Sequence, residues 1–331
     1  MEYRTLGNTE LKISAITFGA WAIGGWRWGG TDEKAAVEAI HAGLDEGMST
    51  IDTAPIYGYG LSEQMIGKAL KGRRREDIQL FTKFGLRWDL PKGELYFKDT
   101  EAKGKVIEVY KYAGKQSVIA ECEQSLKRLN TDYIDLFQIH WPDTVTPIEE
   151  TMEALVILKQ QGKIREAGVC NYTTAQMDTA EQIIPLASNQ IPYSMLLRSA
   201  EEDVIPYCLS RQKGILAYSS MQRGVLTGKF SPDHQFKDGD HRSGRRFYRP
   251  ENIKRINTFL EKIKPIADDH GAAVSQLVLR WTIDQPGITV ALAGARNPAQ
   301  AVQNARASAL KLSGEEMQQI NAALAQLELV A

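Results

Sequence analysis

Cysteine and histidine are scarce in this chain of 331 residues, which holds 3 cysteines and 5 histidines. Cys122, Cys170 and Cys208 are odd in number and widely spaced, so they predict neither a disulfide framework nor a CxxC metal motif. The histidines show no ligand spacing to acids or cysteines, and we expect no metal site. Free thiols are typical of a reducing compartment, so a cytoplasmic protein is expected.

Long apolar runs and net charge are also lacking. No stretch reaches the roughly 18 uninterrupted apolar residues of a membrane span, and residues 1–7, MEYRTLG, carry no apolar core of a secretory signal. With 40 basic and 41 acidic residues, the formal net charge is −1, which gives no support to nucleic-acid or acidic-membrane binding. A small molecule is therefore the expected partner, and nothing in the sequence selects an oligomeric state.

The chain does contain a repeated pattern. A predicted hairpin (residues 2–6 and 11–14) precedes eight short apolar runs that alternate with eight amphipathic helical stretches. The apolar runs are residues 15–18, 49–52, 78–82, 134–139, 167–170, 187–190, 215–218 and 289–293. The helical stretches are residues 32–46, 62–70, 117–129, 147–161, 174–183, 202–211, 274–284 and 298–307. This alternation predicts parallel strands with crossover helices, and the absence of a composition shift favours a single closed (β/α)8 TIM barrel over residues 1–331.

Two connections are long, residues 84–116 after the third predicted strand and residues 222–250 after the seventh. Both would lie at the C-terminal face of the barrel, where enzymes of this fold build their sites. Ser62 is the predicted N-cap of the second helix. A last helix is predicted at residues 313–327, and we expect the tail to contribute to the pocket.

Ionisable side chains stand at the C-terminal ends of three consecutive predicted strands: Asp52, Lys83 and His140, with Tyr57 in the loop after Asp52. Taken singly they could be a loop cap, a solvated lysine, a structural histidine and a turn aromatic. Together they suit carbonyl chemistry, because an ammonium lowers the pKa of a phenol from about 10 and an imidazole can orient a carbonyl oxygen. The group therefore predicts protonation of an oxyanion formed by hydride addition.

These residues lie in motifs similar to those of the aldo-keto reductase superfamily. Residues 51–63 read IDTAPIYGYGLSE, similar to D-T-A-x-x-Y-G followed by S-E; residues 81–83 read FTK; and residues 132–141 read DYIDLFQIHW. Residues 162–165 read GKIR, residues 168–172 read GVCNY, and residues 223–229 read RGVLTGK. The matches run in order from residue 17 to about 304. They resemble a bacterial branch related to general-stress and inositol-related aldo-keto reductases and to channel β-subunits.

The resemblance implies an NADPH-dependent reductase of aldehydes or ketones, with reversible alcohol oxidation and a small-molecule carbonyl substrate. It implies Tyr57 as general acid/base, Lys83 and Asp52 as its tuning partners, and His140 as the residue that orients the carbonyl. It further implies eighteen cofactor contacts: Ala20 and Trp21 in the first loop; Asp52, Cys170, Asn171 and Gln190 near the nicotinamide; Tyr218 stacked on its ring; Ser219, Met221, Arg223, Gly224, Leu226, Gly228 and Lys229 along the pyrophosphate; and Gly294, Arg296, Gln300 and Asn304 around the adenosine 2′-phosphate.

Three positions depart from the family pattern. Cys170 stands where serine is common, and Gln300 stands where many members carry an arginine near the 2′-phosphate. Residues 219–221 read SSM where S-P-L is usual. Arg296 or Lys229 must then supply the charge near the phosphate, so the preference for NADPH over NADH depends on them.

Two further segments have open interpretations. The aromatic first loop, residues 24–30, could shape a substrate pocket together with Trp21, Trp88 and Trp141, or Trp26 and Trp28 could be surface aromatics. The arginine-rich residues 242–249 could touch the cofactor or a partner.

Two rival functions remain open. One is a cofactor-binding regulatory subunit with little turnover, like the channel β-subunits. The other is an aldolase that forms a Schiff base on Lys83, which would need a lowered lysine pKa.

Overall fold

The computed structural model describes residues 1–25, 28–100, 106–236 and 240–331. Eight parallel strands close into a barrel in chain order, so the predicted (β/α)8 fold is confirmed. The ring closes where β13 pairs with β3 and Gly294 lies opposite Gly19. The barrel strands are β3 (Ile16–Gly19), β4 (Thr50–Asp52), β5 (Gln79–Phe84), β9 (Ile134–Ile139), β10 (Ile164–Cys170), β11 (Ser188–Pro192), β12 (Gly214–Tyr218) and β13 (Val290–Gly294).

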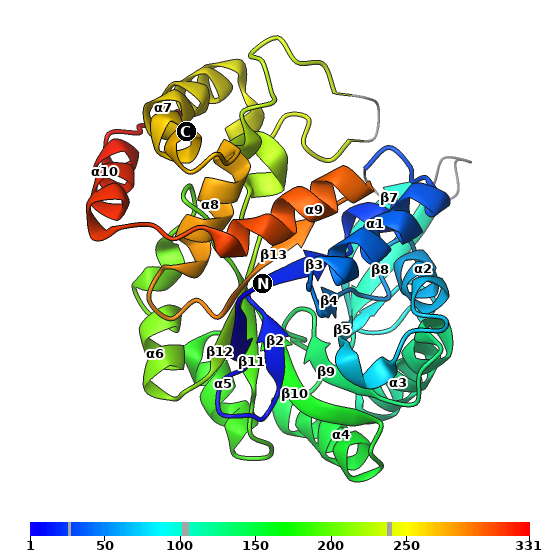
Figure 1. The fold of residues 1–331 in the computed structure, drawn as a ribbon. Coiled ribbons are helices and arrows are strands. Elements are labelled where there is room, and N and C mark those ends of the chain that lie inside the picture. Colours follow the sequence, from blue (N-terminus) through cyan, green and yellow to red (C-terminus); the bar gives the residue numbers. More distant parts are fainter. Residues whose placement is uncertain (26–27, 101–105, 237–239) are drawn as a thin grey trace.

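Helices cover the outside of the barrel (Figure 1). They are α1 (Glu33–Asp45), α2 (Leu61–Ala69), α3 (Lys115–Leu129), α4 (Ile148–Gln160), α5 (Thr174–Glu181), α6 (Val204–Ser210), α8 (Val274–Ile283) and α9 (Pro298–Arg306). Their apolar faces pack against the outward faces of the strands in one continuous core, which includes Phe18, Phe137 and Trp281. This arrangement places every strand end of one polarity at the same rim.

The start of α2 differs from the prediction. Gly60, with a φ of 97°, is the N-cap, and α2 begins at Leu61. The Ser62 side chain is fully buried and its hydroxyl donates to the carbonyl oxygen of Ala20 at 3.0 Å, with the Thr53 hydroxyl 2.8 Å away. Ser62 therefore ties the loop after β4 to the first loop and does not cap the helix.

A twenty-residue helix, α7 (Pro250–Asp269), was not predicted. Its apolar residues recur at helical spacing, with Ile253, Ile256, Leu260 and Ile263 buried against the core. Pro265 lies inside the helix, and this residue and the many charges obscured the pattern in the sequence. Helix α10 (Gly314–Ala325), which was predicted, packs beside α7 outside the ring (Figure 1).

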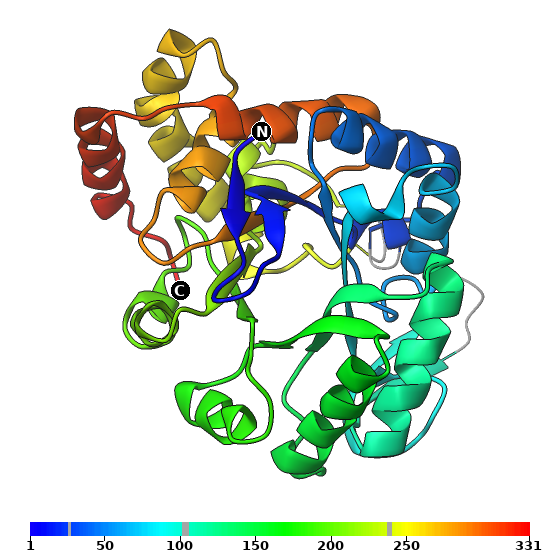
Figure 2. The ribbon, with the colours of Figure 1, turned by 60° about the horizontal axis from the view of Figure 1, so that its bottom comes forward.

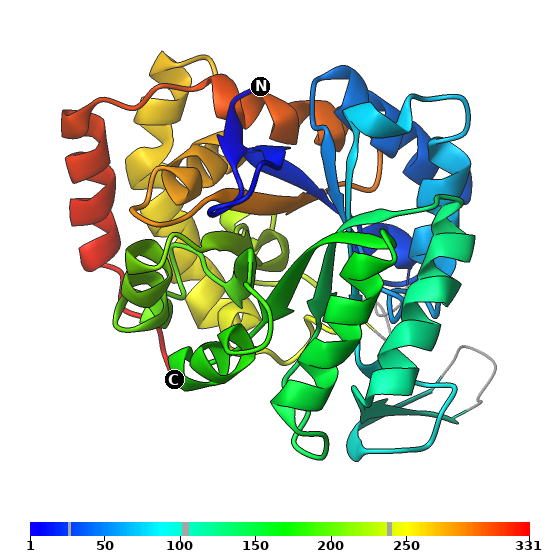
Figure 3. The same ribbon diagram turned by 90° about the horizontal axis from the view of Figure 1, so that it is seen from below.

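The long connection after β5 folds into a small antiparallel sheet that the sequence did not predict. Its strands are β6 (Leu86–Arg87), β7 (Glu94–Thr100) and β8 (Val106–Lys111), in the order β6–β8–β7. We call this unit the side sheet. It projects from the barrel near α3 (Figure 3).

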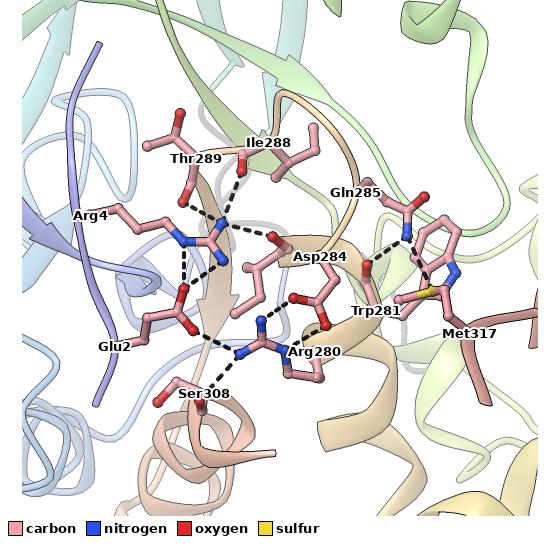
Figure 4. A network of polar contacts seen from close by, with 11 residues as sticks. Glu2, Arg4, Arg280, Trp281, Asp284, Gln285, Ile288, Thr289, Ser308 and Met317 are labelled. Atoms are coloured by element: carbon pink, nitrogen blue, oxygen red, sulfur yellow. Dashed lines mark hydrogen bonds and ion pairs between the residues drawn. The ribbon is translucent and has the colours of Figure 1, made fainter. Parts of the chain in front are cut away.

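The predicted N-terminal hairpin, β1 (Tyr3–Thr5) and β2 (Lys12–Ser14), lies across the N-terminal end of the barrel (Figure 2). Leu6 and Ile13 enter an inner core with Phe81 and Leu136. Polar contacts fasten the hairpin to α8 (Figure 4).

These contacts centre on Glu2, which accepts hydrogen bonds from both Arg4 and Arg280, each at 2.8 Å. Arg280 also binds Asp284 in the next turn of α8, with Nε 2.7 Å from Oδ2. Arg4 donates to the carbonyl oxygens of Ile283 and Ile288, at 2.7 and 3.0 Å. The carboxylate of Glu2 thus joins the N-terminal hairpin to helix α8.

Residues 328–331 fold back onto the start of α7. Asn252 exchanges two hydrogen bonds with Val330, at 2.8 and 3.0 Å, and Arg255 donates to the carbonyl oxygen of Glu328 at 3.0 Å. Arg246 donates to the carbonyl oxygens of Leu329 and Val330 at 3.2 and 3.0 Å. The tail therefore braces the arginine-rich segment that follows β12.

Candidate active site

One large cavity, of about 540 Å³, opens at the C-terminal ends of the barrel strands. The first loop, the loops after β4, β9, β12 and β13, and the side sheet all contribute to its lining. Residues 310–331 do not line it, so the expectation that the tail contributes to the pocket is wrong for the described chain. The two long connections, after β5 and after β12, both line the cavity, as their place on this rim predicts.

The four strand-end residues come together at the floor of this cavity. Lys83 is fully buried in β5, and its Nζ donates to Asp52 Oδ1 at 2.6 Å and to the carbonyl oxygen of Thr53 at 2.8 Å. The Lys83 Nζ lies 5.2 Å from the centre of the Tyr57 ring. The His140 ring stands edge-on to Tyr57, with ring centres 5.7 Å apart. Asp52, Tyr57 and His140 line the cavity, and Lys83 lies behind them.

The backbone around Tyr57 is held by its own loop. The Tyr57 N–H donates to the carbonyl oxygen of Ala54 at 3.1 Å, and Ser62 N–H donates to Tyr57 at 3.1 Å. Gly58 has a φ of 67°, and a Cβ there would lie 2.3 Å from the carbonyl oxygen of Gly24. The loop thus needs glycine at this position to bring Tyr57 over the barrel mouth.

Burial dominates the ionisation of this group. It raises the pKa of Tyr57 to about 12 and outweighs the charge of Lys83, which acts in the opposite direction. The ammonium acts on the pKa of Tyr57 in the expected direction, but burial, which the sequence pattern does not show, has the larger effect. Burial would lower the pKa of Lys83, but the Asp52 carboxylate prevails and raises it. Burial, aided by the charge of Lys83, lowers the pKa of His140 well below its usual range. At neutral pH the site then holds a phenol, an ammonium and a neutral imidazole.

Buried amides connect this floor to the next strands. Gln190 Nε2 donates to Asp52 Oδ2 at 2.8 Å. Asn171, with a φ of 60°, donates from Nδ2 to the carbonyl oxygen of His140 at 3.1 Å and accepts from the Tyr218 hydroxyl at 2.9 Å. Burial raises the pKa of the neighbouring Cys170 thiol, which therefore stays a neutral thiol where serine is common in the family.

Sixteen of the eighteen expected cofactor residues line the cavity. The exceptions are Leu226, which is fully buried in the core, and Gly228, which caps the short 3-10 helix Gln222–Thr227. Leu226 therefore lies beneath the surface, and Gly228 is exposed outside the cavity.

The sequence reasoning also missed several lining residues. They are Thr227, Phe230, His241, Ser275 and Gln303, together with Leu86, Tyr96 and Phe97 of the side sheet. Arg242 and Arg245 also line the cavity, and they belong to the arginine-rich segment 242–249 whose role the sequence left open. Trp141 lines the cavity, and so does Trp28, for which the sequence left a pocket or a surface position open. Trp88 packs beside Tyr59, with ring centres 5.6 Å apart. Trp26 lies outside the described residues.

The wall after β12 has an unusual backbone. Ser219, Gln222, Arg223 and Gly224 have φ values of 58°, 44°, 56° and 104°. Left-handed conformations in non-glycine residues are costly, and they cluster where a ligand is held. The buried Tyr248 hydroxyl fixes this turn by donating to the carbonyl oxygens of Gln222 and Arg223, at 2.9 and 2.7 Å. The turn thereby places Ser219, Arg223 and Gly224 in the lining of the cavity.

The donors of the cavity fit a nicotinamide adenine dinucleotide cofactor. Asp52 is the single carboxylate among the described lining residues, whereas five cations belong to the lining, namely Lys229, Arg223, Arg242, Arg245 and Arg296. The Trp21 indole Nε1 is buried in this wall without a hydrogen-bond partner in the described structure. Such a set suits phosphates at one end and an amide-bearing ring near Asn171 and Gln190. Within the described residues, no group of three His, Cys, Asp or Glu side chains could hold a metal ion.

Comparison with known proteins gives consistent matches. A model described as the Aldo/keto reductase family matches residues 15–325. The chain is 40% identical to Aldo-keto reductase YhdN of Bacillus subtilis, over 98% of this chain and 94% of that protein. It is 33% identical to the NADH-specific methylglyoxal reductase of Escherichia coli, over 93% and 94%. The solved structure of glycerol dehydrogenase AKR11B4 from Gluconobacter oxydans superposes with a TM-score of 0.86 at 36% identity, covering 98% of this chain and 95% of that chain. No helix of the described chain is long and apolar enough to cross a membrane.

Proposed function

This chain belongs to the aldo/keto reductase family and is an oxidoreductase of carbonyl or alcohol groups; on that premise we propose that it reduces small aldehydes or ketones with NADPH. Bound NADPH would supply the hydride. The observation that carries the proposal is the buried Asp52–Lys83 pair beneath Tyr57, with His140 edge-on to the same ring.

Each residue has a role in proton transfer that follows from its state. Tyr57 is a phenol at neutral pH, because its pKa lies at about 12, and it donates a proton to the oxyanion as the carbonyl is reduced. Lys83 stays charged and stabilises the phenolate that remains. His140, neutral, donates one N–H to the carbonyl oxygen and orients it. Asp52 holds Lys83 in place through the 2.6 Å contact.

The preference for NADPH rests on charge. Arg296, Lys229 and Arg245 line the cavity, and the lining includes no carboxylate besides Asp52 in the described chain. An acidic residue would favour the 2′-hydroxyl of NADH, whereas an arginine favours the 2′-phosphate. A relative at 33% identity is named NADH-specific, so this preference needs its own measurement.

The site also bears on the two rival functions, an aldolase and a regulatory subunit. A Schiff-base lysine must lose its proton readily, whereas the Asp52 carboxylate raises the pKa of Lys83. This disfavours the aldolase. A regulatory subunit would bind cofactor without multiple turnover, and turnover separates it from an enzyme.

The test combines turnover and binding. Tyr57→Phe should lower kcat for an aldehyde by at least about a hundredfold while it leaves NADPH affinity near the wild-type value. Retained turnover in that variant at saturating cofactor would refute the assigned role. Arg296→Ala should weaken NADPH binding more than NADH binding in a fluorescence titration. Arg306→Ala, which removes an arginine of α9 that pairs with Glu46 outside the cavity, is the matched control.

A further inference from the structure

The side sheet forms the wall of the cavity next to Tyr57. Leu86, Tyr96 and Phe97 line the cavity. The same sheet shares a separate hydrophobic cluster with Ile56, Tyr57 and Trp141. A carbonyl substrate held at Tyr57 that is large enough to reach this wall therefore touches residues of the sheet. The position of the sheet relative to the barrel then sets the shape of the part of the cavity next to Tyr57, where the substrate would bind.

The chain leaves the barrel for the side sheet at Gly85, where a buried carboxylate holds it. Gly85 has a φ of 87°, a bend that follows β5 directly. Its N–H donates to Glu121 Oε2 of α3 at 3.0 Å. Ser117, one turn earlier in α3, donates to Glu121 Oε1 at 3.3 Å. Glu121 is 3% exposed, so this contact is shielded from water.

Arg87 reinforces the same junction from the first strand of the sheet. Its guanidinium binds Asp89 through two hydrogen bonds, at 2.8 and 3.0 Å. It also donates to the Ser117 hydroxyl and lies 3.7 Å from Glu121 Oε1. Arg87 and, farther away, Asp89 are the charged groups that act on Glu121 in the described chain.

The chain returns to the barrel at Ala113, where a second carboxylate holds it. The Ala113 N–H donates to Asp143 Oδ2 at 2.7 Å. The other oxygen, Oδ1, accepts from the Val145 N–H at 2.8 Å. The Thr151 hydroxyl of α4 donates to the carbonyl oxygen of Ala113 at 2.9 Å. Ala113 is fully buried, so both of its backbone polar groups are satisfied by these side chains.

Both anchors are joined to the catalytic strands. Gly85 follows Lys83 by two residues, and Asp143 follows His140 by three. The His140 N–H also donates to the carbonyl oxygen of Phe84 at 3.0 Å, beside the Gly85 bend. Neither Glu121 nor Asp143 lines the cavity, so neither contacts substrate or cofactor.

We propose that Glu121 and Asp143 are positioning residues, which fix the side sheet at its start and end and thereby set how the enzyme receives bulky carbonyl substrates. The inference rests on the proposed reductase function. It predicts an effect on substrate KM that grows with substrate size, because a large aldehyde contacts the sheet and a small one does not. Cofactor affinity should change little, because most residues assigned to the cofactor lie on other strands, and kcat should change little, because neither carboxyl group lines the cavity.

The experiment compares Glu121→Ala and Asp143→Ala with the wild type. KM for 4-nitrobenzaldehyde should rise about tenfold in each, the loss expected when a buried hydrogen bond is removed. KM for propanal should change less than twofold, and so should kcat and the Kd for NADPH. Glu121→Gln keeps an acceptor for the Gly85 N–H and a polar group near Ser117, so it should restore the wild-type KM. Glu123→Ala is the control on the same helix, since Glu123 is exposed and pairs with Lys163.

A second measurement does not need turnover. Hydrogen–deuterium exchange of β6, β7 and β8 should be about tenfold faster in the two alanine variants, with the barrel strands unchanged. Equal KM changes for the two aldehydes, or unchanged exchange in the sheet, would overturn the inference. A wild-type enzyme that turns over no carbonyl would refute the proposed function instead, and the exchange data would still decide whether the two carboxylates hold the sheet.

Discussion

Glu121 is buried on α3 with a carboxyl group whose pKa is raised from 4.5 to about 7. Burial is the largest cause, and it outweighs the charge of Arg87 and the hydrogen bond from the Gly85 N–H, which both lower the pKa. The folded protein thus holds this proton up to about pH 7, whereas the unfolded chain releases it near pH 4.5. Unfolding releases a proton between these values, so stability falls as pH rises through the interval.

The size of the effect follows from the two pKa values. Each pKa unit corresponds to about 1.4 kcal/mol of differential interaction. The move from 4.5 to about 7 therefore predicts that ionised Glu121 costs the folded state up to about 3 kcal/mol above pH 7. Glutamine has the shape of the protonated acid and cannot ionise. Glu121→Gln should match the wild type near pH 5 and exceed its unfolding free energy by about 1 to 3 kcal/mol at pH 8.5.

Urea unfolding, followed by tryptophan fluorescence at pH 5, 7 and 8.5, measures this difference. The difference in unfolding free energy between Glu121→Gln and the wild type reports the titration of Glu121 alone, since every other group titrates in both proteins. The matched control is Glu123→Gln on the same helix, where hydrogen bonding by Lys163 lowers the pKa of an exposed carboxyl. That variant should lose rather than gain stability at high pH. A Glu121→Gln protein that is less stable than the wild type at pH 8.5, or a gap that does not change with pH, would refute the reasoning.

Three more predictions follow from the same structure. With the pKa of Tyr57 at about 12, reduction should keep a constant kcat from pH 6 to 9, whereas alcohol oxidation should rise about tenfold per pH unit; an alkaline fall in reduction would contradict this. Glu2→Gln should lower the unfolding free energy by about 2 kcal/mol at pH 7. Burial raises the pKa of Glu2, but the hydrogen bonds and charges of Arg280 and Arg4 together have the larger effect and lower it. The stability difference between Glu2→Gln and the wild type should therefore vanish in thermal melts at acid pH. Removing residues 328–331 should weaken NADPH binding about tenfold by titration, with kcat unchanged at saturation.

The barrel could be predicted because its signal is local and repeated. Each strand is a short buried run, and each of the eight crossover helices has an apolar stripe. The catalytic candidates followed from the same pattern, since a parallel barrel brings every strand end to one rim. Asp52, Lys83 and His140 needed no more than this rule to be placed together.

The side sheet and α7 were not predictable on that basis. Strands β7 and β8 are half exposed, so they lack the apolar run that marked the barrel strands. Helix α7 has an apolar spacing that could have been recognised, but Pro250, Pro265 and the charges between them weakened it. The raised pKa of Tyr57 depends on burial under the loop and side sheet, which no strand-end rule contains.

Glu121 is the clearest example of a residue whose role could not be predicted from the sequence. It stands two residues from Glu123 and one turn from Ser125, on a stretch of helix that looks solvated in the sequence. In the fold, the bend at Gly85 brings a backbone N–H to its carboxyl group, and Glu121 is 3% exposed. Because this bend directly follows β5, which carries Lys83, the residues of proton transfer and the start of the substrate wall are neighbours along the chain. Substitutions farther out in the sheet can then alter which carbonyl enters without moving the group that protonates it.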